Sequence, residues 1–344
     1  MPSARRSLTA ALVTSIAAVA LLGVLSGCGQ SDDAKAGPDD TPLRKVRVVL
    51  DWTPNTNHSG MYLAQANGWY EDAGLAVSFI EPGDASNLQL LAAGKADVAV
   101  SVAEEVLPAR AQGLPVMSVA AIIEHNTSSL VSLKSDGISR PRDLEGKTYA
   151  GWGGLLEKAL IDRLVSCDGG DPSKVKFVDV GEADYRIGLE RNQYDVVWIF
   201  DGWDGIRLTQ IDKVPLARLP FIDHDDCIPD WYTPLLASSD RMAKKRPADL
   251  AAFLAATSRG YQAAMEDPTA ATNALMKASP DLDRNLVTRS ATFLATRYAD
   301  DPKQWGQQSD QVWSSFSAFL TKAGLVNKSL DATKAWTNEF LRKR

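Results

Sequence analysis

The chain of 344 residues has only three histidines and three cysteines, which limits the metal and catalytic sites that it can build. No two histidines stand four residues apart and no C-x-x-C pair occurs, so the common zinc-binding spacings are absent. The G-x-S-x-G turn and the dinucleotide-binding glycine pattern are missing too. Gly146-Lys147-Thr148 matches the end of a phosphate-binding loop, but Pro141 replaces its first glycine. We therefore expect no metal site and none of these catalytic sites.

The sequence also lacks a segment rich in positive charge. It holds 37 Lys and Arg against 43 Asp and Glu, and the cations are scattered along the chain. Nucleic acids are bound by basic stripes or patches. We therefore expect no nucleic-acid partner.

No apolar run is long enough to span a membrane. The run at residues 10–24 follows two arginines and is shorter than the roughly 20 residues that a spanning helix needs. It ends in Leu25-Ser-Gly-Cys28, which resembles a bacterial lipobox and implies that Cys28 carries a diacylglycerol. An ordinary signal peptide is the alternative. We expect an exported protein, anchored by lipid to the outer face of the cell membrane.

These features predict a lipoprotein signal peptide at residues 1–27 and a flexible tether at 28–44, where Ser, Asp, Gly and Pro are frequent. The remaining 300 or so residues exceed the usual size of a single core and predict two lobes. Cys167 and Cys227 lie in this part. In an exported protein they either pair or stay free, and the sequence leaves both open.

Runs of β-branched residues alternate with helical patterns, which predicts an α/β fold with mostly parallel sheets. The expected strands are 46–50, 77–81, 98–102, 116–123, 147–150, 175–179 and 196–200, and the helices between them are 58–67, 85–93, 105–112, 155–167 and 183–190. Two such units follow one another. Each contains a helix end at Gly94 or Asn192 that is followed, three residues later, by an Asp leading a strand.

Only helices are expected from residue 240 onward, at 247–265, 268–277, 286–297, 308–323 and 333–342. These helices have no sheet of their own, so we expect them to pack on the first sheet. Lobe 1 would then comprise residues 45–132 and 236–344, and lobe 2 residues 133–235. The two chain crossings would form a hinge beside a cleft.

Aromatic and acidic residues follow several predicted strands, at the sheet edge where α/β proteins bind ligands. The candidate ligand-binding residues are Trp52, Asn57, His58, Tyr62, Glu104, Glu105, Trp152, Gly153, Glu157, Asp201, Trp203 and Tyr232. Taken singly, Asn57 favours a helix N-cap and Trp52 a core position. Four tryptophans at one cleft, namely the three in this list and Trp231, favour a stacking site instead. No Lys or Arg is found among the residues collected at these strand ends, so a flat ring that donates hydrogen bonds fits better than an anion.

Three roles follow for these side chains. Trp152 and Trp203 are expected to stack on the ring, and Glu104, Glu105 or Glu157 to accept hydrogen bonds from its amino group. Asn57, His58 and Tyr62 would complete a polar rim.

The segments 50–58, 149–153, 198–205 and 232–234 resemble a known family. They are similar to the thiamine-pyrimidine branch of the periplasmic binding proteins related to yeast-type thiamine-pyrimidine synthase, over residues 46–333. The resemblance implies a type II-like two-lobed fold and a solute-binding protein that delivers a formylaminopyrimidine or hydroxymethylpyrimidine to the permease and ATPase subunits of an ABC importer.

The same family contains the synthase, an enzyme. In its matching segment a Lys and a His carry the chemistry, whereas Ser101 and Glu105 stand in those places here. Its clustered cysteines are replaced by residues 228–232, and its phosphate loop by 151–154. The resemblance therefore implies a binding protein without a cofactor rather than an enzyme. A sulfonate, taurine or nitrate receptor of the wider family is the alternative, and flavin-like rings stay open.

Overall fold

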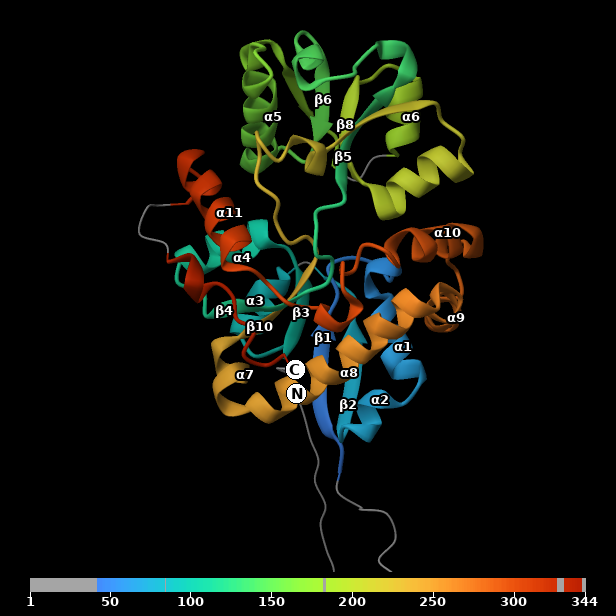
Figure 1. Cartoon of the computed structure of the whole chain (residues 1–344), viewed down its shortest axis with the longest axis vertical. Helices are drawn as coiled ribbons and strands as arrows, with labels where there is room; N and C mark the ends of the chain where they lie inside the picture. The colour runs from blue at the N-terminus through green and yellow to red at the C-terminus, as the bar shows by residue number, and fades with distance from the viewer. Residues whose placement is uncertain (1–41, 84, 182–183, 327–330, 342–344) are drawn as a thin grey trace, which may run out of the picture. The chain divides into compact units, whose positions relative to one another are not determined.

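Two five-stranded sheets, each flanked by helices, form the framework of the protein (Figure 1). The computed structural model describes residues 42–83, 85–181, 184–326 and 331–341. The predicted signal peptide, Cys28 and most of the predicted tether lie outside these residues. Both sheets belong to one compact unit that begins at Pro42.

The first sheet has the strand order β2-β1-β3-β10-β4. Its strands are β1 (Arg44–Val49), β2 (Leu75–Ile80), β3 (Val98–Ser101), β4 (Val116–Ala121) and β10 (Leu235–Ser239). Strand β1 is parallel to β2 and β3, and β10 is antiparallel to both β3 and β4. All residues of β3 and β10 are buried, as expected where both faces of a sheet are covered.

The second sheet repeats this plan with the order β7-β6-β8-β5-β9. Its strands are β5 (Ser128–Leu133), β6 (Thr148–Gly151), β7 (Lys176–Asp179), β8 (Val196–Phe200) and β9 (Leu216–Pro220). Strand β6 is parallel to β7 and β8, and β5 is antiparallel to β8 and β9. The predicted α/β, two-lobed fold is therefore confirmed.

The lobe boundaries need a small correction. The expected boundary between residues 132 and 133 falls inside β5, which pairs only with strands of the second sheet. The chain therefore crosses before Ser128. It returns before Leu235, because β10 belongs entirely to the first sheet.

The helices predicted between residues 58 and 323 are present, and two further helices of the described chain, α2 and α7, were not predicted. The helices are α1 (Ser59–Ala66), α2 (Trp69–Asp72), α3 (Asn87–Ala92), α4 (Ala103–Ala111), α5 (Leu155–Cys167), α6 (Tyr185–Glu190), α7 (Asp240–Lys245), α8 (Pro247–Glu266), α9 (Pro268–Ala278), α10 (Arg284–Leu294) and α11 (Asp310–Lys322). A π-helical segment follows β8, with η5 (Asp201–Gly205) and η6 (Arg207–Ile211). No helix in the described ranges combines the length and hydropathy that crossing a bilayer requires.

The helix predicted at residues 333–342 is wrong for the part that the structure describes. Only a short 3-10 turn, η9 (Ala332–Lys334), forms there. The chain then runs beside strand β4: the amide of Ser118 donates to Ala335 O, and Thr337 N donates to Ser118 O. Phe340 and Leu341 are buried in the core of the first lobe. Pairing with the sheet edge thus replaces the helical hydrogen bonds.

Both lobes contain the helix-ending turn that the sequence predicts at Gly94 and at Asn192. Gly94 and Asn192 both adopt left-handed backbone conformations, with φ of 68° and 52°. Three residues later, a carboxylate accepts a hydrogen bond from the amide of a neighbouring strand: Asp97 from Arg47 N at 3.0 Å and Asp195 from Thr148 N at 2.7 Å. The same turn therefore sets strand register in both lobes.

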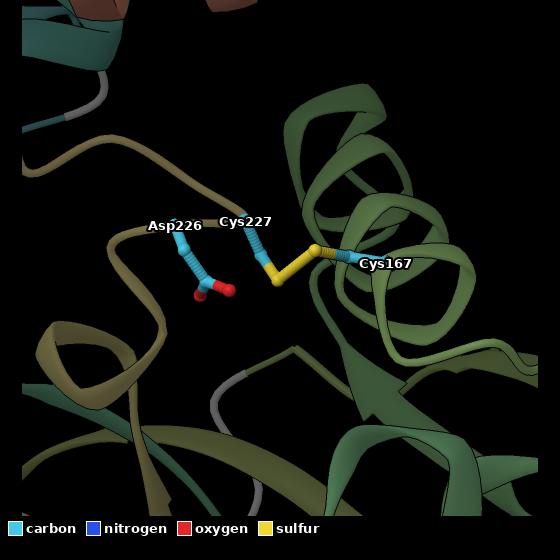
Figure 2. Close-up of side chains that lie close together, drawn as sticks. All are labelled: Cys167, Asp226 and Cys227. Carbon is cyan, nitrogen blue, oxygen red and sulfur yellow. A yellow bond between two sulfur atoms is a disulfide. The ribbon is translucent and has the colours of Figure 1, made fainter.

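Cys167 and Cys227 form a disulfide, which settles the pairing that the sequence left open. Figure 2 shows the bond joining the end of α5 to the loop before the return crossing, with Asp226 beside it. Arg163 Nε donates to Cys227 O at 2.9 Å and adds a second link between helix and loop. Residues 221–231 are thereby tied to lobe 2.

Candidate ligand-binding site

A cavity of about 680 Å³ lies between residues of the two lobes. The first lobe supplies its wall from the loop after β1, the start of α4 and the return crossing. The second lobe supplies the loop after β6, the start of α6 and the π-helical segment after β8. The lining residues are Asp51, Trp52, Asn55, Asn57, Val102, Glu105, Trp152, Asp184, Tyr185, Phe200, Trp203, Asp204, Arg207, Thr233 and Pro234.

A smaller cavity of about 390 Å³ adjoins the first one. The two share Asp51, Val102 and Glu105, and the smaller one continues along the loop after β2 to Asn87. The side chain of Asn87 donates to Leu50 O and Val100 O and so fixes this wall. Asp51 and Glu105 therefore stand where the two cavities meet.

Hydrogen bonds within the loop after β1 fix its shape. Asn55, rather than the predicted Asn57, is the N-cap, because its side chain accepts from the amide of Asn57. His58 Nδ1 accepts from Asn55 N, so the ring proton is on Nε2, which donates to Asp51 Oδ1 at 2.7 Å. His58 is fully buried and does not line the cavity. It holds Asp51 in place from beneath.

The C-terminal helices brace this loop from behind. Tyr261 of α8 donates its hydroxyl hydrogen to Asn57 O, and Tyr298 donates to Thr56 O, each at 2.6 Å. Helices α1 and α8 approach closely at two glycines, since a Cβ on Gly260 would lie 1.9 Å from Gly60 O. The packing predicted for the C-terminal helices thus positions the cavity wall.

Three tryptophans line the cavity, one from the first lobe and two from the second. Trp52 and Trp152 are each 45% exposed, and Trp203 is half-buried. The Trp152 ring contacts the edge of Tyr185, with the ring centroids 6.3 Å apart. Exposed aromatic faces that gather in a hollow indicate a stacking site for a flat ligand.

Four carboxylates face the same cavity: Asp51, Glu105, Asp184 and Asp204. Ser101 donates to Glu105 at 3.0 Å, and burial raises the pKa of the Glu105 carboxyl. Removal from water raises the pKa of Asp204 to about 6. The cavity therefore offers several hydrogen-bond acceptors in a partly desolvated space.

Arg207 also lines the cavity, so the absence of cations inferred from the strand ends is wrong. It was missed because it follows β8 by seven residues, on a π-helical segment whose course has no sequence period. Its Nη2 lies 3.8 Å from Asp184 Oδ1, and its Nε has no hydrogen-bond partner among the described residues. Arg207 therefore offers a donor on the second-lobe wall.

Two of the three predicted acceptor glutamates lie away from the cavity. Glu157 is buried and accepts from the amides of Trp152 and Gly154 and from the hydroxyl of Tyr149. It therefore shapes the loop that carries Trp152. Burial raises the pKa of Glu104 to about 8, while a hydrogen bond from its own backbone amide opposes the shift.

Four other predicted residues also lie outside the cavity wall. Asp201 accepts from Ser129 and is paired with Arg218. Tyr232 is buried, and its hydroxyl accepts from Ser309 N at 2.7 Å.

Tyr62 is buried against Phe79, with the ring centroids 4.8 Å apart. Gly153 takes a left-handed conformation with φ of 72° beside Asp179. These two residues thus support the loops around the cavity.

Two groups of possible metal ligands occur among the described residues, and in both the side chains already bond to other protein groups. Cys167 and Cys227 are joined in the disulfide beside Asp226. The second group is Glu124, His125 and Asp300.

His125 lies on the first chain crossing, between β4 and β5. Its Nδ1 lies 2.7 Å from Asp230 Oδ2, which joins the two crossing segments, and Asp300 N donates to Glu124. The bond to Asp230 raises the pKa of His125 to about 9, so the ring is charged at neutral pH.

The two sheets and their order give the chain the fold of the periplasmic binding proteins. The aliphatic sulphonate binding protein SsuA from Escherichia coli has the same fold, with a TM-score of 0.67 and 18% identity over 88% of this chain and 94% of that one. SsuA from Xanthomonas axonopodis, solved with MOPS, gives a TM-score of 0.63 at 18% identity, covering 88% and 99%.

Residues 55–271 match the family model described as NMT1/THI5 like, and the chain belongs to this family. A formylaminopyrimidine-binding protein from Halalkalibacterium halodurans is 26% identical over 87% of this chain and 92% of its own. A 4-amino-5-hydroxymethyl-2-methylpyrimidine phosphate synthase from Legionella pneumophila is 26% identical over 86% and 92%. The family thus includes binding proteins and enzymes, and the first relative and the fold support a solute-binding role.

Proposed function

We propose that the chain is an exported, lipid-anchored solute-binding protein that delivers a thiamine-precursor pyrimidine to an ABC importer. The observation that carries this proposal is the cavity, where three tryptophans and several carboxylates converge from the two lobes. A flat aminopyrimidine gains from stacking on the indole rings. Its amino hydrogens find acceptors in Glu105 and Asp51. The relative named as a formylaminopyrimidine-binding protein supports the same ligand class.

The residues around the cavity favour binding over synthesis. Ser101 and Glu105, which occupy the positions of the synthase's Lys and His in the family resemblance, are hydrogen-bonded to each other. A hydroxyl and a carboxylate supply neither the amine nor the imidazole that this chemistry uses. Membership in a family that contains synthases makes a direct assay for pyrimidine synthesis a necessary control.

A sulfonate or nitrate ligand is the second candidate, and Arg207 is the observation that favours it. Among the described residues, however, this wall holds one cation and four carboxylates, and Asp184 lies 3.8 Å from the Arg207 guanidinium. An anion would gain one attraction and meet several repulsions. The charge of the cavity therefore favours a neutral or cationic ring.

Thermal-shift measurements on one protein preparation separate these candidates. The panel contains 4-amino-5-hydroxymethyl-2-methylpyrimidine, its phosphate, an alkanesulfonate, nitrate and riboflavin. We expect the free pyrimidine to raise the melting temperature most and the phosphate to be weaker, because it adds negative charge to an acidic cavity. Stabilisation by the sulfonate alone would refute the proposal.

The proposed anchor is tested at Cys28. Replacing Cys28 with Ala should release the exported protein from the membrane fraction, because the diacylglycerol would be lost. The matched control is Ser26→Ala, which alters the same motif without removing the thiol. Membrane association that persists in the Cys28→Ala variant would contradict lipid attachment at this residue.

A further inference from the structure

The four cavity carboxylates differ in how many hydrogen bonds their oxygens already accept from the protein. Asp51 accepts from the buried imidazole of His58, and Glu105 accepts from a serine hydroxyl. Asp184 is the N-cap of α6 and accepts from two backbone amides. Asp204 differs, because no hydrogen bond or ion pair within 4.0 Å joins it to any residue that the structure describes.

Leaving a carboxylate partly desolvated and unpaired costs free energy. Asp204 bears this cost in the cavity wall, next to Trp203, a predicted stacking residue. Removal from water raises the pKa of Asp204 to about 6, against the opposing charge of Arg207. Its carboxyl group therefore gains a proton more readily than an exposed aspartate does.

A carboxyl group that holds one proton presents a donor and an acceptor side by side. A 4-aminopyrimidine presents the complementary pair, since the amino group donates and the adjacent ring nitrogen accepts. We propose that Asp204 is the residue that recognises this edge of the ring, and that a proton is taken up from solution and shared between Asp204 and the ring nitrogen in the complex. This inference rests on the proposed pyrimidine-binding function and goes beyond it by naming the residue and the proton.

The charges around Asp204 determine how this proton responds to pH. On the second lobe these are Arg207 of η6 and Asp184 before α6, and Asp51 and Glu105 lie on the opposite wall. Helix α10 packs against η5 and carries Arg284 and Arg289. These two side chains donate to Asn273 and Gln210. Burial favours protonation of Asp204, and the charge of Arg207 opposes it.

Two substitutions separate recognition from protonation. Asp204→Asn keeps an acceptor and gains a permanent N–H donor, so it can pair with the same edge without a proton from solution. We expect its affinity for 4-amino-5-hydroxymethyl-2-methylpyrimidine to stay within about threefold of the parent protein. Asp204→Ala removes both groups, and we expect a loss of about 10- to 100-fold. The analogue 5-hydroxymethyl-2-methylpyrimidine lacks the amino group but keeps the ring nitrogen, so Asp204→Ala should weaken its binding less than it weakens that of the aminopyrimidine.

Titration calorimetry in buffers of different ionisation enthalpy counts the protons. At pH 7 the parent protein should take up close to one proton, because the free Asp204 carboxyl is mostly ionised there, and the uptake should fall toward pH 5, where the free carboxyl and the free ring nitrogen already hold protons. The Asp204→Asn variant should take up none at pH 7. Asp223→Asn is the matched control, because Asp223 is an exposed carboxylate of the same lobe outside the cavity, and it should behave as the parent protein does.

The outcomes distinguish this inference from the proposed function. If the parent protein binds the pyrimidine without proton uptake, or if Asp204→Ala binds it equally well, the inference is overturned and pyrimidine binding stands. If the parent protein binds no pyrimidine, both fail together. Melting curves of each variant show whether it is folded, and the conservative Asp204→Asn variant keeps the proton count decisive if the alanine variant does not fold.

Discussion

Truncation of Trp152 should weaken pyrimidine binding strongly while leaving the fold intact. The side chain is 45% exposed in the cavity wall. For a tryptophan of about 250 Å², this leaves roughly 110 Å² of surface, of which a ring can cover about half. Burial of about 55 Å² contributes about 1.4 kcal/mol, and the stacked pair adds about 0.5 to 1.5 kcal/mol. Trp152→Ala should therefore raise the Kd by about 25- to 140-fold.

Calorimetric titration with 4-amino-5-hydroxymethyl-2-methylpyrimidine measures this effect. Trp152→Phe should recover most of the affinity, because it keeps an aromatic face. Trp69→Ala is the control, since Trp69 lies on α2 against Arg259 and outside the ligand cavity. An unchanged Kd in Trp152→Ala, or an equal loss in Trp69→Ala, would refute stacking at this position.

Three further changes test the supports of the cavity. Replacing both Cys167 and Cys227 with Ser should lower the free energy of unfolding by about 4 kcal/mol, because the bond closes a loop with a sequence separation of 60, and denaturant titration measures this. Gly260→Ala should destabilise the folded protein by about 1 to 3 kcal/mol or more, because the new Cβ would overlap Gly60 O. Gly83→Ala is the control, since its Cβ would meet open space, and melting curves of the two variants test the difference. Because His125 has a folded pKa of about 9 and an unfolded value of about 6.5, its contribution should be complete below pH 6.5 and lost as pH rises through 9. Because the His125 side chain is half-exposed, this contribution to stability should be small. Denaturant titrations at several pH values should show that the parent protein loses its stability advantage over His125→Gln across this range.

The strand and loop after residue 46 were predictable because their signals are local. A buried run rich in valine leads into a polar loop and then a helix, and the structure places Asp51, Trp52 and Asn57 in the cavity wall accordingly. The choice of N-cap was not predictable from residue type, because Asn55 and Asn57 are chemically identical. Only the hydrogen bond between them shows which one caps the turn.

The direction of the acidic side chains depends on tertiary contacts that the sequence does not encode locally. Glu157 has the residue type of a ligand acceptor, but three donors of its own lobe already engage it. Asp201 and Asp204 stand three residues apart on the same segment. Asp201 turns to Ser129 on β5, whereas Asp204 faces the cavity. A π-helical course decides this difference, and residue spacing alone does not predict it.

The position of Arg207 shows why the fold alone does not determine the ligand. Proteins named as sulfonate-binding share this fold, so the fold by itself does not select a pyrimidine. Here, the Arg207 guanidinium lies 3.8 Å from Asp184, and its charge also acts on Asp204. The protein's own carboxylates therefore already offset its positive charge. A neutral ring that both donates and accepts hydrogen bonds can pair with Asp204 without adding net charge to the cavity. The balance of charges in the wall, rather than the presence of a cation, therefore favours the pyrimidine class.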